Sequence, residues 1–151
     1  MKAKYITPVV TVMDKEGNPD MEGCGKVYEH LIQGGVDGIL LMGSIGEFFA
    51  LTMSQKKELI RYAVHKINHR TQLIVGTTSM IVDEIIELSR FAKQEGADAV
   101  IILPPYYFPL GEKSLENYFG MLAEALSDQP IYLYNFPDRT GYELTPENTR
   151  R

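Results

Sequence analysis

The sequence QGGVDGILLMGS, residues 33–44, contains the pattern that decides the fold class. Glycines end a helix-like segment, Asp37 stands in the turn, and a short apolar run leads into a glycine–serine loop. The sequence QEGADAVIILPP, residues 94–105, repeats this order with Asp98 in the turn. Short and nearly continuous apolar runs are typical of strands buried on both faces of a parallel sheet. The repeat therefore predicts successive helix–turn–strand units.

Working outward from this repeat, we expect five strands separated by helices. The strands are expected at residues 5–12, 38–42, 72–77, 99–103 and 131–134. The helices are expected at residues 21–33, 54–67, 82–95 and 114–127, with Ser54 as one N-cap and Gly96 as one terminator. In the second helix Leu59 and Ile60 begin the apolar face, and Lys56 is expected to lie off it.

The order of these elements is βαβαβαβαβ, and it allows two architectures. One is an open, doubly wound five-stranded sheet, and the other is part of a (β/α)8 barrel, which usually needs about 250 residues. The sequence TPEN, residues 145–148, predicts the start of a further helix, with Thr145 as N-cap and Pro146 at the first helical position. Composition does not choose between the two architectures, so the loops must do so.

Composition and charge exclude several classes of function. The chain has 151 residues and a net charge of −5, with no long basic run, so a nucleic-acid surface is not expected. Cys24 is the only cysteine, which fits a reducing cytoplasm. No segment approaches the roughly 20 apolar residues that a membrane span needs, and we interpret the N-terminal segment as a strand, not a signal peptide. We expect a cytoplasmic protein without nucleic-acid or membrane partners.

Ligands of parallel α/β folds bind beyond the carboxyl ends of the strands, so the loops there are the candidate site. The loop GSIGE, residues 43–47, has two glycines around Ser44, and its successive N–H groups can form an anion-binding nest. The simpler interpretation is a tight strand–helix turn that needs glycine. The loop has no GK[ST] and no G-x-G-x-x-G pattern, so a nucleotide site is not expected.

Two later loops also carry polar chemistry. The sequence PPYYFP, residues 104–109, presents Tyr107 between prolines, either as a functional side chain or as a packing or subunit contact. Arg139 in NFPDRTG can grip a carboxylate with two hydrogen bonds, or it pairs with Asp138 or stays solvated. Tyr134 ends the fifth strand and can relay protons when bonded to another hydroxyl, or it is a half-buried core tyrosine.

Other reactive residues have simpler interpretations. His65 and His69 have i, i+4 spacing on one expected helix, but no acidic residue lies between them and the helix is an outer one. Cys24 is expected to be a small packing residue and His30 to lie at a helix flank. The sequence predicts neither a metal site nor a cofactor.

Taken together, GSIGE, PPYYF and YNFPDRTG resemble the dihydrodipicolinate synthase / N-acetylneuraminate lyase family, and the resemblance extends from TPVVTVMD to LTPE. It implies a (β/α)8 barrel, of which residues 1–151 form a single partial domain with βα units 1–4, strand 5 and the start of helix 5. It implies a class I, Schiff-base aldolase that acts on pyruvate, with the backbone of Gly43, Ser44 and Ile45 holding the carboxylate. It implies Tyr134 as proton relay.

The resemblance also implies further roles. Ser44 links Tyr134 to Tyr107, which reaches in from a neighbouring subunit of a homodimer or homotetramer, and Arg139 binds the distal carboxylate of the acceptor. Ile45 stands where the synthases of lysine biosynthesis have a second threonine. The second substrate is therefore aspartate semialdehyde or a 2-keto-3-deoxy sugar acid.

The lysine that forms the Schiff base lies on the sixth strand of the family, and none of the lysines in this chain lies at the end of an expected strand. We therefore expect this chain to be a truncated portion that is inactive alone. Two alternatives stay open: an open-sheet anion-binding domain, and a non-catalytic interaction fragment.

Overall fold

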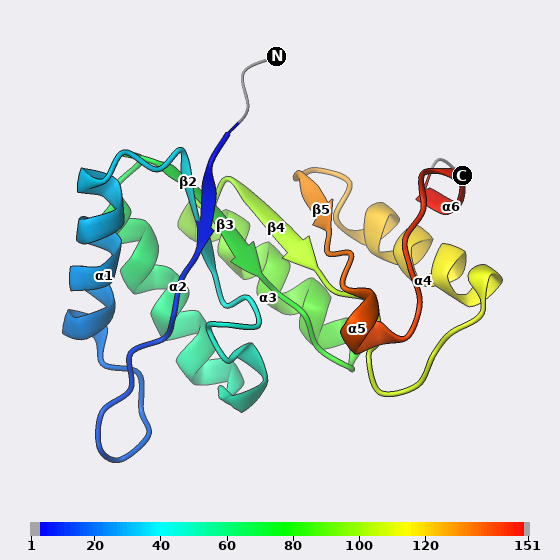
Figure 1. Cartoon of the computed structure of the whole chain (residues 1–151), viewed down its shortest axis with the longest axis horizontal. Coiled ribbons are helices and arrows are strands. Elements are labelled where there is room, and N and C mark those ends of the chain that lie inside the picture. The colour runs from blue at the N-terminus through cyan, green and yellow to red at the C-terminus, as the bar shows by residue number, and fades with distance from the viewer. Residues whose placement is uncertain (1–3, 150–151) are drawn as a thin grey trace.

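The computed structural model describes residues 4–149 of the chain, and its elements follow the predicted order (Figure 1). The strands are β1 (Ile6–Pro8), β2 (Gly38–Leu41), β3 (Gln72–Gly76), β4 (Ala99–Ile102) and β5 (Ile131–Leu133). The long helices are α1 (Met21–Gln33), α2 (Met53–Ile67), α3 (Val82–Glu95) and α4 (Glu112–Ala125). Three short elements complete the chain: the 3₁₀ turn η1 (Phe48–Ala50), α5 (Pro137–Thr140) and α6 (Pro146–Thr149).

The strands form one parallel sheet in the order β1-β2-β3-β4-β5, so each strand lies beside its neighbours in sequence. The four long helices cover the same side of the sheet (Figure 1). A doubly wound sheet reverses its strand order at a switch point and carries helices on both faces. The sequential order is instead that of a β/α barrel, so the open-sheet alternative is not the fold of this chain.

The hydrophobic core lies between the sheet and the helices. Ile39 and Leu41 of β2 and Val75 of β3 point into it, where they meet Leu59 and Ile85 of the helices. The opposite, inner face of the sheet carries a second and smaller cluster, formed by the buried side chains of Leu40, Ile74 and Ala99 with Ile6 and Ile101 packed against them. Neighbouring residues of a strand therefore alternate between the two faces, as strands covered on both sides require.

Several element boundaries differ from the sequence prediction. The first strand covers three residues, Ile6–Pro8, although the Val9 N–H still donates to the Leu40 carbonyl oxygen at 3.0 Å. Met13, expected just beyond this strand, pairs antiparallel with Pro19. Helix α2 begins after Thr52, not Ser54, because the side chains of Thr52 and Gln55 form a reciprocal capping box. Helix α4 begins at Glu112, two residues before the expected start.

The residues around the end of α2 correct a second prediction. Asn68 takes the left-handed conformation that ends many helices, with φ of 47°, so the helix stops at Ile67. His69 lies beyond the helix and also has a positive φ, so His65 and His69 are not on one helical face.

Lys56 was expected to lie off the apolar face, and this expectation is wrong. The residue is only 8% exposed, and its ammonium nitrogen lies 6.0 Å from the centre of the Phe48 ring. Burial lowers the pKa of the Lys56 amine, and the nearby Glu84 carboxylate opposes this shift in part. Lys56 precedes Ile60 by four residues and Leu59 by three, so the helical spacing itself did place it beside the apolar stripe.

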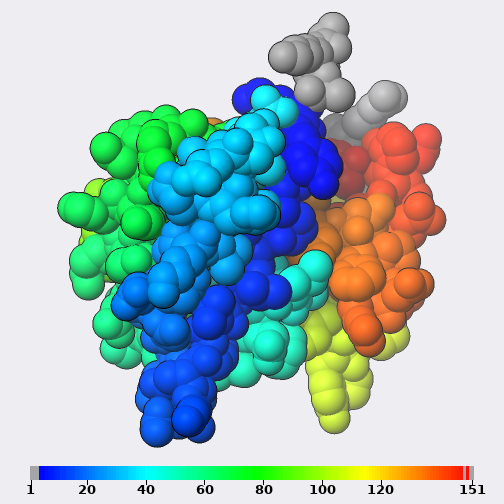
Figure 2. All heavy atoms as spheres, turned by 60° about the vertical axis from the view of Figure 1, so that its left-hand side comes forward, coloured from blue at the N-terminus to red at the C-terminus, as the bar shows by residue number. Residues whose placement is uncertain are grey.

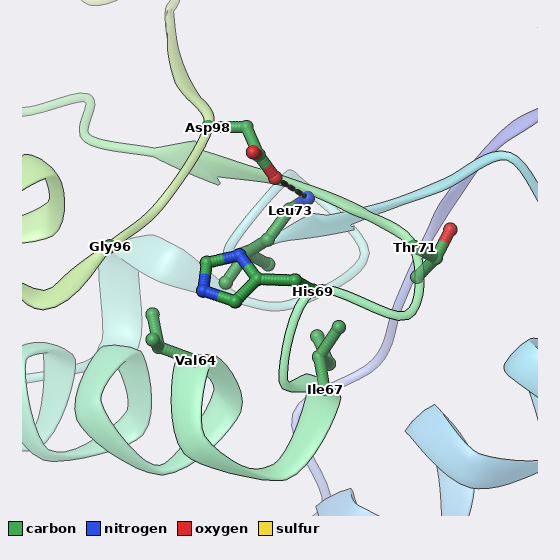
Figure 3. A pocket seen from close by; sticks show the side chains of 7 residues that line it. All are labelled: Val64, Ile67, His69, Thr71, Leu73, Gly96 and Asp98. Atoms are coloured by element: carbon green, nitrogen blue, oxygen red, sulfur yellow. Dashed lines mark hydrogen bonds between the residues drawn. The ribbon is translucent and has the colours of Figure 1, made fainter.

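The two aspartates of the sequence repeat have the same structural role. Asp98 accepts a hydrogen bond from the backbone N–H of Leu73 at 2.7 Å (Figure 3), and Asp37 accepts one from the N–H of Tyr5 at 2.8 Å. Each aspartate thereby ties the start of its own strand to the preceding strand. The hollow beside Asp98 and His69 has a volume of about 10 Å³, which is room for roughly one water molecule. Both aspartates therefore have a structural role at the amino ends of the strands.

Candidate functional site

The loop GSIGE follows β2 and is held in one conformation. Met42, which precedes the loop, and Glu47, its last residue, both have positive φ values, 54° and 52°. A side chain on Gly46 would meet the Val9 carbonyl oxygen at 3.0 Å and the Met42 backbone at 3.1 Å, and Thr11 donates a hydrogen bond of 2.7 Å to the Gly46 carbonyl. The turn therefore does need a glycine, at Gly46. Left-handed conformations of non-glycine residues cost of order 1–3 kcal/mol and often mark functional sites.

The same loop leaves backbone donors free for a ligand. Glu47 donates its N–H to the Ser44 carbonyl oxygen at 3.2 Å, whereas the N–H groups of Ser44 and Ile45 bond to no partner within residues 4–149. Gly43 is buried and its Cβ position meets only the Leu40 side chain, at 3.5 Å. Adjacent free N–H groups at the end of a strand are what an anion-binding nest requires.

Ser44 and Tyr134 meet across the sheet. Their hydroxyl oxygens lie 3.3 Å apart, although the residues are separated by 90 positions in the sequence and follow strands β2 and β5. In a flat sheet β2 and β5 would be about 14 Å apart, which is three strand spacings and more than the two side chains span together. The contact therefore requires the sheet to curve as a barrel wall does. Figure 2 shows the loop after β2, in cyan, and the end of β5, in orange, on the same side of the molecule.

Arg139 lies in the short helix α5, which follows Tyr134. Its guanidinium carbon lies 5.9 Å from the centre of the Phe136 ring, and this ring stacks on Tyr134 at 5.7 Å with an interplanar angle of 15°. Phe136 thus links the relay candidate to the candidate carboxylate-binding residue. The ion pair with Asp138 is not found among the described residues. Arg139 is an exposed residue.

Tyr107 does not join Ser44 and Tyr134 in this chain. It is 75% exposed and packs edge-to-face against Phe108, with ring centres 4.7 Å apart. The first tyrosine of the pair, Tyr106, turns inward instead and packs against Phe48 at 6.2 Å. The exposed ring of Tyr107 is compatible with a role in a neighbouring subunit, and that role stays a prediction.

Sequence reasoning missed two residues of this region. Phe136 stands between Arg139 and Tyr134, and its position two residues after Tyr134 was a signal that both side chains would lie on one side of the chain. Lys56 packs its ammonium group over Phe48, directly after the GSIGE loop. A buried lysine is uncommon, and the apolar spacing of α2 contained this information.

The described part of the chain contains neither a metal-binding cluster of side chains nor a membrane-spanning helix. Residues 4–149 contain no group of three or more histidine, cysteine, aspartate or glutamate residues arranged to hold a metal ion. No helix within the same range has the length and apolar character that crossing a bilayer requires. His30 lies in the last turn of α1, and Cys24 is fully buried, where desolvation raises the pKa of its thiol.

The sequential parallel strands, the outer helices and the loops at the carboxyl ends of the strands define the class of this chain as part of a β/α barrel with a candidate ligand site. The model of the dihydrodipicolinate synthetase family matches residues 1–151, and the chain belongs to this family. The family resemblance inferred from the loops is thereby confirmed.

The relatives include both aldolases and synthases. YagE of Escherichia coli K12, a candidate 2-dehydro-3-deoxy-D-gluconate aldolase, is 38% identical over 93% of this chain and 46% of its own length. The 4-hydroxy-tetrahydrodipicolinate synthase of Prochlorococcus marinus MIT 9515 is 36% identical over 98% of this chain and 49% of its own length. The crystal structure of YagE in complex with pyruvate has a TM-score of 0.91, with 37% identity over 96% of this chain and 48% of that one. The chain thus spans about half the length of these relatives.

Proposed function

We propose that this chain supplies the pyruvate-binding half of a Schiff-base-forming lyase or synthase. The observation that carries the proposal is the hydroxyl pair of Ser44 and Tyr134 beside the free N–H groups of Ser44 and Ile45. The family membership and the pyruvate in the YagE structure support it. When an amine attacks the keto carbon of a 2-oxo acid, the site must bind the carboxylate of that acid and must relay protons.

In this proposal the backbone of Gly43, Ser44 and Ile45 holds the pyruvate carboxylate. A lysine amine attacks the keto carbon, the oxygen leaves as water, and an imine forms. Tyr134 takes and returns the protons of these steps, with Ser44 as its hydrogen-bond partner. The imine then loses a methyl proton and becomes an enamine, whose carbon attacks an aldehyde. In the cleavage direction the same carbon–carbon bond breaks, the aldehyde leaves, and the enamine remains.

The attacking lysine is proposed to lie outside the 151 residues, on a strand beside β5. Three of the described lysines have partners elsewhere: Lys4 bonds to Gln72 at the amino end of β3, and Lys57 and Lys93 pair with acidic residues of other outer elements. Lys56 is buried but belongs to the outer helix α2. The β5 edge carries no strand within residues 4–149, which leaves a place for the next βα unit.

Arg139 is proposed to bind the second substrate through a carboxylate, and Tyr107 to act near a subunit contact of a cytoplasmic homo-oligomer. Two classes of second substrate fit an exposed arginine at this position: aspartate semialdehyde and a 2-keto-3-deoxy sugar acid. The side chain of Ile45 offers no hydroxyl to a substrate. The aldolase YagE and the synthases are similar to this chain to nearly the same degree, so similarity does not choose between the two substrates.

The test completes the barrel by joining residues 1–151 to the second half of YagE. Purified protein is assayed for condensation of pyruvate with aspartate semialdehyde and for cleavage of 2-keto-3-deoxygluconate. We expect one of the two activities, and a loss of at least about tenfold in kcat for Ser44→Ala and Tyr134→Phe, since general acid–base groups contribute 10²–10⁴-fold. Tyr132→Phe, two residues earlier and within β5, serves as the matched control. A folded chimera without either activity, or one that Tyr134→Phe leaves unchanged, contradicts the proposal.

A further inference from the structure

The loop that holds Arg139 and the loop that holds Tyr107 are joined by one hydrogen bond between distant residues. The Tyr142 hydroxyl donates to the Pro105 carbonyl oxygen at 2.7 Å, across 37 positions of the sequence. The two loops approach a second time, because the Cβ position of Gly141 lies 3.7 Å from the Cβ of Pro109. The contact between the loops therefore extends from Pro105 to Pro109.

The loop on the Arg139 side is closed on itself. The Asn135 side chain accepts a hydrogen bond from the N–H of Leu144 at 3.0 Å and donates one to the carbonyl oxygen of Leu144 at 3.1 Å. The buried Thr140 hydroxyl lies 2.9 Å from the carbonyl oxygen of Tyr142, to which it donates, and Gly141 takes the left-handed conformation with φ of 76°. Residues 135–144 thus form a compact unit from which the Tyr142 side chain projects.

The loop on the Tyr107 side is fixed at its start by hydrogen bonds to two hydroxyl groups. Tyr118 of α4 donates to the Leu103 carbonyl oxygen at 3.4 Å, and the Thr78 hydroxyl accepts the N–H of Leu103 at 2.8 Å. Tyr142 then donates to a carbonyl two residues further along the chain, that of Pro105. Because the Pro105 carbonyl belongs to the peptide that joins Pro105 to Tyr106, its orientation sets the direction in which the chain runs on to Tyr107.

We propose that Tyr142 is a positioning residue that makes the Arg139 loop and the Tyr107 loop move as one unit. The inference rests on the proposed function for its catalytic meaning, since the two loops would carry the carboxylate-binding group and the subunit-bridging tyrosine. Burial raises the pKa of the Tyr142 hydroxyl, so it stays protonated and able to donate through the neutral range.

The coupling is tested on the 151-residue chain by limited proteolysis. Chymotryptic cleavage after Tyr106 and Tyr107 reports the opening of one loop, and tryptic cleavage after Arg139 reports the opening of the other; mass spectrometry of the fragments identifies each cleaved bond. We expect Tyr142→Phe to raise both cleavage rates by about two- to tenfold, the effect of losing one hydrogen bond. Tyr132→Phe, an exposed tyrosine on β5, is the matched control and should leave both rates unchanged. Cleavage at Arg61 and Arg90 in the helices reports global unfolding and should not change.

A second variant separates coupling from a local effect. Asn135→Ala opens the Arg139 loop without touching the Tyr107 loop, and we expect chymotryptic cleavage after Tyr106 and Tyr107 to rise with it. The proposal is overturned if either variant raises cleavage after Arg139 but not after Tyr106 and Tyr107. It is also overturned if cleavage at Arg61 and Arg90 becomes faster by the same factor as cleavage in the loops. These outcomes are read without enzyme activity, so they stand apart from the proposed function.

In the completed barrel the same substitution has a kinetic signature. We expect Tyr142→Phe to raise KM for the second substrate and to lower kcat, with KM for pyruvate unchanged, because Gly43, Ser44 and Ile45 lie on another loop. An equal rise in both KM values, or no change in either, contradicts the positioning role. If the wild-type chimera is inactive, the proposed function fails while the proteolysis still decides the coupling.

Discussion

Strands β2 and β5 each end in one half of the candidate site, yet they have different surroundings. All four residues of Gly38–Leu41 are buried, with β1 and β3 on either side. In β5, Tyr132 is 46% exposed and Leu133 is 40% exposed, and β4 is the single neighbouring strand within residues 4–149. The loop with Ser44 therefore rests on a complete framework. Tyr134 and Arg139 follow an edge strand, and no strand of the described residues pairs with its free side.

The helix side of β5 shows the same difference. A groove of about 460 Å³ lies between α4 and β5, and it is lined in part by Phe119, Leu122, Ile131, Leu133 and Leu144. An exposed strand edge beside an apolar groove is a place where another strand and helix can pack. This arrangement is what a β/α barrel offers to its next unit.

The largest expected effect compares one leucine from each strand. Leu41→Ala should lower the free energy of unfolding by about 2–5 kcal/mol, because it opens a cavity in a filled core. Leu133→Ala should lower it by less than about 1 kcal/mol, because much of that side chain already meets solvent. Denaturant unfolding followed by circular dichroism measures both. Equal losses at the two positions would remove the distinction between a covered and an edge strand.

A smaller effect is expected within the loop after β2. Gly46→Ala should cost about 1–3 kcal/mol, because the new methyl group meets backbone atoms of Val9 and Met42 at 3.0–3.1 Å. Gly43→Ala is the matched control, since its methyl group would make an ordinary contact with Leu40 at 3.5 Å. Thermal unfolding of the two variants sharpens the comparison. A loop that accepts both substitutions equally would not be the rigid turn described above.

The smallest expected effect concerns Lys56 and depends on pH. Burial lowers the pKa of Lys56 from its ordinary value of 10.5, so the folded state binds this proton less tightly than the unfolded state. Below the folded-state pKa both states are protonated and the penalty for burying the charge is complete. Between that pKa and 10.5 the unfolded state binds more protons, so stability rises with pH.

Lys56→Met should therefore stabilise the chain at neutral pH, by about 1 kcal/mol or less after the loss of the interactions with Glu84 and Phe48. The gain should shrink as the pH rises toward 10.5. Lys57→Met, whose ion pair with Glu87 is on the surface, should change stability by less than about 0.5 kcal/mol. A gain at Lys56 that grows with pH would have the wrong sign.

Much of the fold was predictable because it depends on local patterns. The repeat around Asp37 and Asp98 predicted parallel strands, and the loops predicted the family. The choice of a barrel over an open sheet was not available from composition, because it depends on curvature that Ser44 and Tyr134 reveal only by meeting across two intervening strands. The link from Tyr142 to Pro105 is likewise a contact between distant residues, and no spacing in the sequence indicates it.

Two misses had local signals. Asn68 is a common helix terminator in the left-handed conformation, and it places His69 outside α2. Lys56 fell on the apolar spacing but was assigned to solvent on its charge. The charge of Lys56 predicted an exposed side chain and its position on the helix predicted a buried one; the side chain is buried.

The central claim is that these residues form the carboxylate-binding and proton-relay half of a site whose attacking lysine lies elsewhere. The most direct measurement is borohydride reduction in the presence of pyruvate, followed by peptide mass spectrometry, on the 151-residue chain and on the chimera with the second half of YagE. The account predicts a reduced pyruvate adduct on the chimera alone, on a lysine outside residues 1–151, and a weaker adduct when Ser44→Ala is introduced. An adduct on a lysine of the 151-residue chain, Lys56 included, would contradict the claim.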